Sequence, residues 1–223
     1  GVVDRMAKDI LTIGHLTCVG STFAGTREII SRFQDAGVKS ILALRGDSPI
    51  GDPDALAKGE LKTALDLVSL VRDETDLEIG VAAFPEVHPE SPNMTHDAEV
   101  LALKQSAGAS YAMTQLFFTV EAYLDLVTAA KQAGSTMPII PGVMPIYNIK
   151  QLARFASNCG AEIPRWLRIK LESYGDDLPS LRSFGVDVIS ELCETLVSWD
   201  VPSLHFYTLN QAGIISRIIQ NIE

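Results

Sequence analysis

Two kinds of hydrophobic pattern alternate along this chain, and the alternation limits its possible folds more than any other feature. Short apolar runs rich in β-branched residues predict six strands, at about 11–19, 38–44, 78–84, 110–117, 138–143 and 203–209. Segments with helical spacing separate them, among them Thr26 to Ala36, Ala55 to Arg72, Val120 to Ala133 and Leu181 to Val197. Three strands follow an alanine–glycine pair typical of a helix end: Ala36-Gly37, Ala107-Gly108 and Ala133-Gly134. Strands that alternate with helices predict right-handed crossovers and a parallel sheet.

Two parallel architectures compete, a doubly wound nucleotide-binding sheet and a (β/α)8 TIM barrel. The chain has neither a G-x-G-x-x-G turn after its first strand nor a P-loop. Polar groups instead end several strand-like runs, which favours a barrel. A closed barrel needs eight strands, so we expect that the first two β/α units are missing from this chain. No linker or low-complexity tract divides the sequence, and residues 1–223 are predicted to form a single, incomplete barrel domain.

Composition narrows the function classes. The net charge of −10 argues against a nucleic-acid surface or an anionic membrane as partner. No apolar run approaches the length of a membrane span. The three cysteines, Cys18, Cys159 and Cys193, lack metal-ligand spacing. A sparse, odd set of cysteines without a signal peptide predicts a cytoplasmic protein.

Arg45, Gly46 and Asp47 end the strand predicted at 38–44, where barrel enzymes carry their chemistry. Gly46 would let the backbone approach a flat ligand, and Arg45 could meet a phosphate with two hydrogen bonds. Asp47 could stabilise developing positive charge or orient a ring nitrogen. An ordinary strand-to-loop turn is the alternative.

Other strand ends carry further candidates. His15 interrupts the first strand, although a lone strand histidine is more often a core residue. Phe84 and His88 belong to a loop stiffened by prolines, where we expect His88 to bind a cofactor with Phe84 packed on a ring. Glu86 and His88 form an E-x-H pair, but without a third ligand we predict no metal.

The later strand ends carry amides. Gln115 could pair with the donor–acceptor edge of a pterin or purine, while the neighbouring aromatic residues are expected in the core. Gln151 and Phe155 are four residues apart and share a helical face, unless they belong to an ordinary helix after a turn. No nucleophilic triad is present, so the site is suited to a cofactor that carries the chemistry itself.

These same segments resemble the methylenetetrahydrofolate reductase family, in order and over nearly the whole chain. The resemblance rests on 14–18, 43–47, 83–89, 114–118, 140–145 and 205–210. It implies an enzyme with a TIM barrel that binds FAD without a dinucleotide fingerprint. NADH or NADPH would donate hydride, which FAD would pass to 5,10-methylenetetrahydrofolate to give 5-methyltetrahydrofolate for methionine synthesis.

The resemblance also assigns roles to single residues. The catalytic residues would be Asp47, Gln115 and Phe155. The FAD contacts would be His15, Arg45, Gly46, Asp47, Phe84, His88, Asp97 and Lys104. The folate contacts would be Gln115, Gln151 and Gln211. Lys104 lies two helical turns after Asp97 and would give the FAD diphosphate a cation.

The sequence departs from the family pattern at several positions. The family's catalytic glutamate belongs to a first-strand segment that is absent here. Phe84 stands where tyrosine is common, Val100 and Leu103 occupy a helix face that is usually polar, and Gln211 stands where an arginine often meets the folate tail. Two alternatives therefore remain, another folate or pterin barrel such as a methyltransferase, and a degenerate barrel that serves as partner subunit or ligand sensor. By analogy with other barrels we expect a homo-oligomer.

Overall fold

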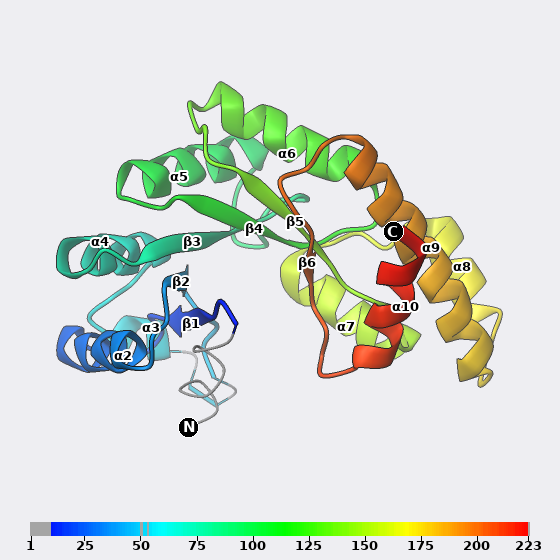
Figure 1. The fold of residues 1–223 in the computed structure, drawn as a ribbon, viewed down its shortest axis with the longest axis horizontal. Coiled ribbons are helices and arrows are strands. Elements are labelled where there is room, and N and C mark those ends of the chain that lie inside the picture. Colours follow the sequence, from blue (N-terminus) through cyan, green and yellow to red (C-terminus); the bar gives the residue numbers. More distant parts are fainter. Residues whose placement is uncertain (1–9, 50, 53, 223) are drawn as a thin grey trace. The chain divides into compact units, whose positions relative to one another are not determined.

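The computed structural model describes residues 10–49, 51–52 and 54–222, and its strands form one sheet in chain order (Figure 1). The strands are β1 (Ile13–Thr17), β2 (Ser40–Leu44), β3 (Glu78–Ala83), β4 (Tyr111–Leu116), β5 (Ile139–Val143) and β6 (His205–Phe206). The pairs β1–β2, β2–β3 and β5–β6 are parallel. Sequential strand order with helical connections is the topology of a (β/α)8 barrel, of which six strands are described. The predicted fold class is confirmed.

Helices connect the strands. They are α2 (Phe23–Asp35), α3 (Ala55–Lys58), α4 (Ala64–Glu74), α5 (Met94–Ser106), α6 (Val120–Gln132), α7 (Ile149–Cys159), α8 (Arg165–Glu172), α9 (Leu178–Ser198) and α10 (Ala212–Ile222). The single helix predicted from Ala55 to Arg72 is wrong, because α3 ends before an extended Gly59. Helix α4 then begins with a capping box, in which the side chains of Thr63 and Asp66 each accept the other's backbone N–H.

The chain divides into two compact units, whose boundaries fall inside β3, α5 and β4. Unit 1 comprises Gly1–Ala82 and Ala102–Ala112, and unit 2 comprises Ala83–Leu101 and Met113–Glu223.

Unit 1 is built on β2, whose first four residues are buried. Helix α4 packs against this strand and buries Leu67 and Val68 completely. The hydroxyl groups of Ser40 and Tyr111 lie 2.8 Å apart and satisfy each other inside this core. Both hydroxyl groups are therefore hydrogen-bonded although they are buried.

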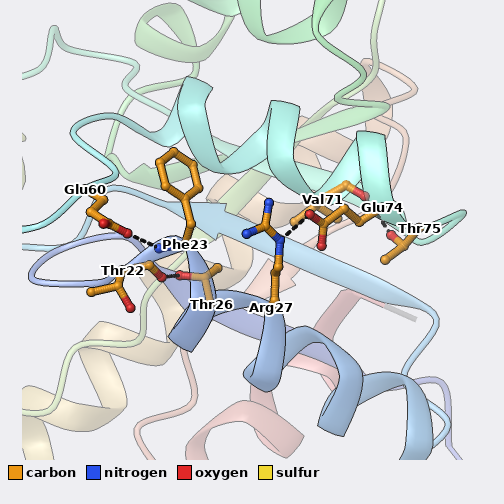
Figure 2. A network of polar contacts seen from close by, with 8 residues as sticks. All are labelled: Thr22, Phe23, Thr26, Arg27, Glu60, Val71, Glu74 and Thr75. Atoms are coloured by element: carbon orange, nitrogen blue, oxygen red, sulfur yellow. Dashed lines mark hydrogen bonds and ion pairs between the residues drawn. The ribbon is translucent and has the colours of Figure 1, made fainter.

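Polar contacts join α2 to α4 and to Glu60, in the segment that precedes α4 (Figure 2). The backbone N–H of Phe23 donates to Glu60 Oε2 over 2.6 Å, and Arg27 forms an ion pair with Glu74. A hollow of about 320 Å³ lies beside these contacts, lined by Phe23, Arg27, Asp66, Ser69, Leu70, Asp73 and Glu74. None of these residues is a predicted site residue, and the contacts hold the two helices together.

Unit 2 packs its longest helix, α9, against α10 and α6 (Figure 1). The side chains of Ile189, Cys193 and Leu196 on α9 are fully buried. Helix α9 begins after Asp177, whose side chain accepts the backbone N–H of Ser180. Helix α8 packs against α7 inside the long connection predicted at 160–202.

Strand β6 has two residues, which is shorter than the run predicted at 203–209. Its pairing with β5 continues for one residue, since Tyr207 N–H donates to Val143 O over 2.9 Å. Leu209 and Asn210 then adopt left-handed backbone conformations that a strand cannot contain. No helix in the part of the chain that the structure describes has the length and apolar character to cross a bilayer.

Candidate functional site

In unit 1, the ends of β1 and β2 hold the first group of predicted site residues. Their pairing continues beyond the strands, because Val19 N–H donates to Arg45 O over 2.9 Å. Gly46 follows with φ +79°, and a Cβ there would lie 2.8 Å from Val19 Cγ1 and 2.9 Å from Thr17 Cβ. Only glycine allows the turn to fold so closely over the end of β1.

Side chains near this turn differ in exposure. Arg45 is half-buried and Asp47 is exposed. His15 is exposed, but it occupies the middle of β1 rather than the strand end that the sequence predicted. Burial raises the pKa of the Cys18 thiol, which disfavours the reactive thiolate form.

Lys104, predicted to contact the cofactor diphosphate, belongs to α5 in unit 1. Its Nζ donates to Ala82 O over 3.4 Å, close to the end of β3. The predicted two-turn spacing from Asp97 is confirmed, because both residues belong to α5.

In unit 2, the loop after β3 carries Phe84 and His88. The backbone N–H of His88 donates to Asp97 Oδ2 over 2.8 Å, and the backbone N–H of Glu90 donates to His88 Nδ1 over 3.0 Å. Because Nδ1 accepts, the neutral imidazole carries its proton at Nε2. The ring of Phe84 lies edge-on to that of His88, with 4.5 Å between centroids. The loop therefore fixes both the position and the tautomer of His88.

The same loop contains two further irregular residues. Val87 has φ +72°, a left-handed conformation that is rare for a β-branched side chain. The Ser91 hydroxyl oxygen is buried and finds no hydrogen-bond partner within the described part of the chain. Backbone strain and an unsatisfied buried hydroxyl are both typical of binding sites.

Glu86 lies between Phe84 and His88 in the same loop. Its Oε2 accepts the backbone N–H of Glu162 over 3.0 Å. Burial raises the pKa of this carboxyl group. Among residues 10–49, 51–52 and 54–222, no three His, Cys, Asp or Glu side chains lie close enough to hold a metal ion.

The ends of β4, β5 and β6 meet at Thr114. Its Oγ1 accepts the backbone N–H of Gly142 over 2.8 Å, and its carbonyl accepts the Tyr207 hydroxyl over 2.8 Å. A Cβ at Gly142 would lie 2.2 Å from Thr114 O, so the strands approach too closely for any side chain there. Gln115 is half-buried, while Phe117 and Phe118 are buried as predicted.

Helix α7 carries Gln151 and Phe155 on one face, as predicted. The Asn148 side chain caps the helix by accepting Gln151 N–H over 2.8 Å, and its Nδ2 donates to Gln151 Oε1 over 3.4 Å. The guanidinium carbon of Arg154 lies 5.2 Å from the centroid of the Phe155 ring. Sequence analysis missed Asn148, although an Asn three residues before a Gln is a recognisable cap signal.

Gln211 follows a turn held by Tyr147, a residue that sequence analysis also missed. The Tyr147 hydroxyl lies 3.0 Å from Thr208 O and 3.3 Å from Gln211 O, and it can donate to either. The turn between them contains Leu209 at φ +48° and Asn210 at φ +59°. Two successive left-handed residues without glycine mark a second strained loop after a strand.

Comparisons with known proteins agree with one another. A family model described as methylenetetrahydrofolate reductase matches residues 3–223. A 5,10-methylenetetrahydrofolate reductase from Buchnera aphidicola subsp. Schizaphis graminum is 38% identical over 219 residues, covering 97% of this chain and 73% of the relative. The Escherichia coli K12 protein of the same name is 37% identical over 222 residues, covering 100% and 73%.

A solved structure resembles the fold. It is an uncharacterised protein from Clostridium thermocellum that binds two copies of 5-methyl-5,6,7,8-tetrahydrofolic acid. The TM-score is 0.62 at 21% identity, and the match covers 96% of this chain and 72% of that one.

Proposed function

The chain belongs to the methylenetetrahydrofolate reductase family, and from that premise we propose that it reduces 5,10-methylenetetrahydrofolate to 5-methyltetrahydrofolate. NADH or NADPH is the proposed hydride donor, FAD is the proposed cofactor, and the product would feed methionine synthesis. Three named features of the molecule support this proposal: the amide-bearing strand ends, the residues available to FAD, and the carboxylate of Asp47.

The observation that carries the proposal is the shared location of the three proposed folate contacts and Phe155. Gln115 belongs to β4, Gln151 and Phe155 to the helix after β5, and Gln211 to the loop after β6. All four belong to unit 2, at or after the carboxyl ends of strands, where barrel enzymes bind substrate. Side-chain amides both donate and accept, which suits the donor–acceptor edge of a pterin.

The chemistry of the residues fits FAD. In unit 2, the Ser91 hydroxyl is buried without a partner among the described residues, and the neutral His88 ring can donate from Nε2 because its Nδ1 accepts. Two more residues belong to the unit 2 set proposed for FAD. Phe84 packs on the His88 ring, and Asp97 accepts the backbone N–H of His88. In unit 1, His15, Arg45, Gly46, Asp47 and Lys104 form the other proposed set. When bound, FAD supplies a two-electron carrier between nicotinamide and folate.

Asp47 has the most direct catalytic role in the proposal. Its exposed carboxylate follows the rigid Gly46 turn, so it can stabilise positive charge that develops on the folate during reduction. Gln115 and Gln151 orient the pterin, and Phe155 packs against the substrate or nicotinamide ring. Gln211 binds toward the folate tail.

We also propose that units 1 and 2 belong to one catalytic domain in a cytoplasmic homo-oligomer. The unit boundaries fall inside two strands and one helix, which is unusual for separate domains. All three cysteines are free thiols, as a reducing compartment would keep them.

The test is the visible spectrum of the purified protein under anaerobic conditions. Flavin bands should bleach on addition of NADH or NADPH and should recover when methylenetetrahydrofolate is added. A colourless protein that binds no added FAD would contradict the proposal. If it still bound 5-methyltetrahydrofolate, a folate-binding subunit or sensor would replace the enzyme.

A further inference from the structure

We propose that Glu86 is a positioning residue that fastens the loop after β3 to the C-terminal end of α7. That loop carries Phe84 and His88, and α7 carries Gln151 and Phe155. The inference rests on the proposed function, in which the first pair contacts FAD and the second pair contacts folate. Through this fastening, FAD binding and folate binding each depend on Glu86.

Two contacts within unit 2 join the loop to the helix end. Glu86 Oε2 accepts the backbone N–H of Glu162 over 3.0 Å. One residue further, Val87 O faces Gly160, where a Cβ would lie 2.8 Å from that oxygen. Gly160 ends α7 with φ +75°. The glycine thus ends the helix and also leaves room for the loop to dock.

The loop is stiff enough to transmit a displacement at Glu86 to His88. Pro85 and Pro89 fix their own φ angles on either side. Asp97 holds the backbone N–H of His88, and the His88 ring packs against Phe84. If the Glu86 contact is lost, the strained Val87 between these anchors can relax and change the position of the His88 ring.

Helix α7 is held at both ends in a comparable way. Asn148 caps its first turn, and Glu86 and Val87 hold the residues that follow its last turn. Gln151 and Phe155 occupy successive turns between these two anchors. Freedom at the C-terminal anchor allows the helix to shift along its axis, which moves both side chains relative to the substrate.

The test is a double-mutant cycle on the Glu86–Glu162 contact. Glu86→Ala removes the acceptor, and Glu162→Pro removes the donated backbone N–H while leaving Glu86 intact. Glu86→Gln keeps an acceptor oxygen and is the rescue variant. Glu162→Gln is the matched control, because it changes an exposed side chain and retains the N–H. Thermal unfolding shows that each variant folds.

The readouts are equilibrium affinities for FAD and for 5-methyltetrahydrofolate, both measured without turnover. We expect Glu86→Ala to weaken each by about tenfold, as for loss of a hydrogen bond to a charged acceptor. Glu162→Pro should weaken both affinities to the same extent. The double variant should bind each ligand no more weakly than either single variant does. Glu86→Gln should stay within about threefold of the wild type, because a neutral acceptor remains.

Unchanged affinities in Glu86→Ala would overturn the inference, as would a lower unfolding temperature without any change in affinity. Additive losses in the double variant would also overturn it, because the two residues would then act separately. Failure of the proposed function would be visible in the wild-type protein, as flavin that NADH and NADPH do not bleach. The two failures are therefore distinguishable.

Discussion

The backbone N–H of His88 donates to the carboxylate of Asp97 over 2.8 Å, which ties the loop after β3 to the first turn of α5. A carboxylate in the first turn of a helix is also favoured by the helix dipole. The family resemblance predicts that both residues contact FAD. Given their direct hydrogen bond, we predict that Asp97 affects FAD binding by holding the backbone of His88.

Asp97→Ala should therefore weaken FAD binding by about tenfold, since it leaves the His88 N–H without a charged acceptor. Flavin fluorescence titration measures this change. Glu99→Ala is the matched control, an exposed carboxylate on the same helix, and its affinity should equal that of the wild type. If both variants lost FAD affinity equally, the loss would reflect the removed negative charge, and the prediction for Asp97 would be wrong.

Asp47→Asn should slow folate reduction by about one hundredfold, because one charged group aimed at developing charge is neutralised. Flavin reduction by nicotinamide should change far less, and the two half-reactions separate in stopped-flow absorbance. Asp47 is exposed, so stability should not change. An unchanged folate half-reaction would refute the assigned role of Asp47.

Ser91→Ala should have opposite effects on stability and on binding. Without ligand, removal of an unsatisfied buried hydroxyl should leave the free energy of unfolding unchanged or raise it by about 1 kcal/mol. FAD affinity should fall several-fold, since the hydroxyl would no longer meet its ligand partner. Chemical denaturation and flavin titration give the two values, and a loss of stability would contradict this account.

Tyr147→Phe should lower the free energy of unfolding by about 1–2 kcal/mol and raise KM for the folate. The hydroxyl can donate to the carbonyl of Thr208 or of Gln211, and the left-handed Leu209 and Asn210 lie between these two residues. Tyr123→Phe is the matched control, because the Tyr123 hydroxyl donates over 2.8 Å to Ile139 O inside the same unit. Tyr123→Phe should lower the free energy of unfolding by a comparable amount without changing KM for the folate.

Glu86→Gln should alter the pH dependence of stability. Burial raises the folded-state pKa of Glu86 above its ordinary value of 4.5, so ionisation of this residue favours the unfolded chain. As pH rises from 4.5 through the raised value, the wild type should lose stability relative to the variant. Denaturation at pH 4, 6 and 8 measures the difference, and a pH-independent difference would contradict the prediction.

Much of the fold could be predicted because parallel strands and their helices leave strong local patterns. Each described strand lies within a predicted run, and Gly37, Gly108 and Gly134 all have positive φ after their helices. The predicted boundaries of helices and strands were wrong where the backbone conformation of single residues interrupts the hydrophobic pattern. Gly59 splits the helix predicted from Ala55 to Arg72, and the last strand ends at Phe206, before the left-handed Leu209.

The site was less predictable, because its decisive contacts join residues far apart in sequence. The hydrogen bond from Glu162 to Glu86 spans 76 residues, and that from Tyr207 to Thr114 spans 93. No periodicity or spacing encodes such pairs. Asn148 is different, since its cap is local and its signal can be read from the sequence.

The close approach at Gly142 restricts which substitutions this chain can accept between β4 and β5. A methyl group at position 142 would overlap the Thr114 carbonyl. Only glycine therefore fits at this position as long as Tyr207 and Thr114 stay in contact. New substrate preferences must then arise in the segments beyond the strands. A library built to alter specificity should keep Thr114, Gly142 and Tyr207 constant and randomise Gln151 and Gln211.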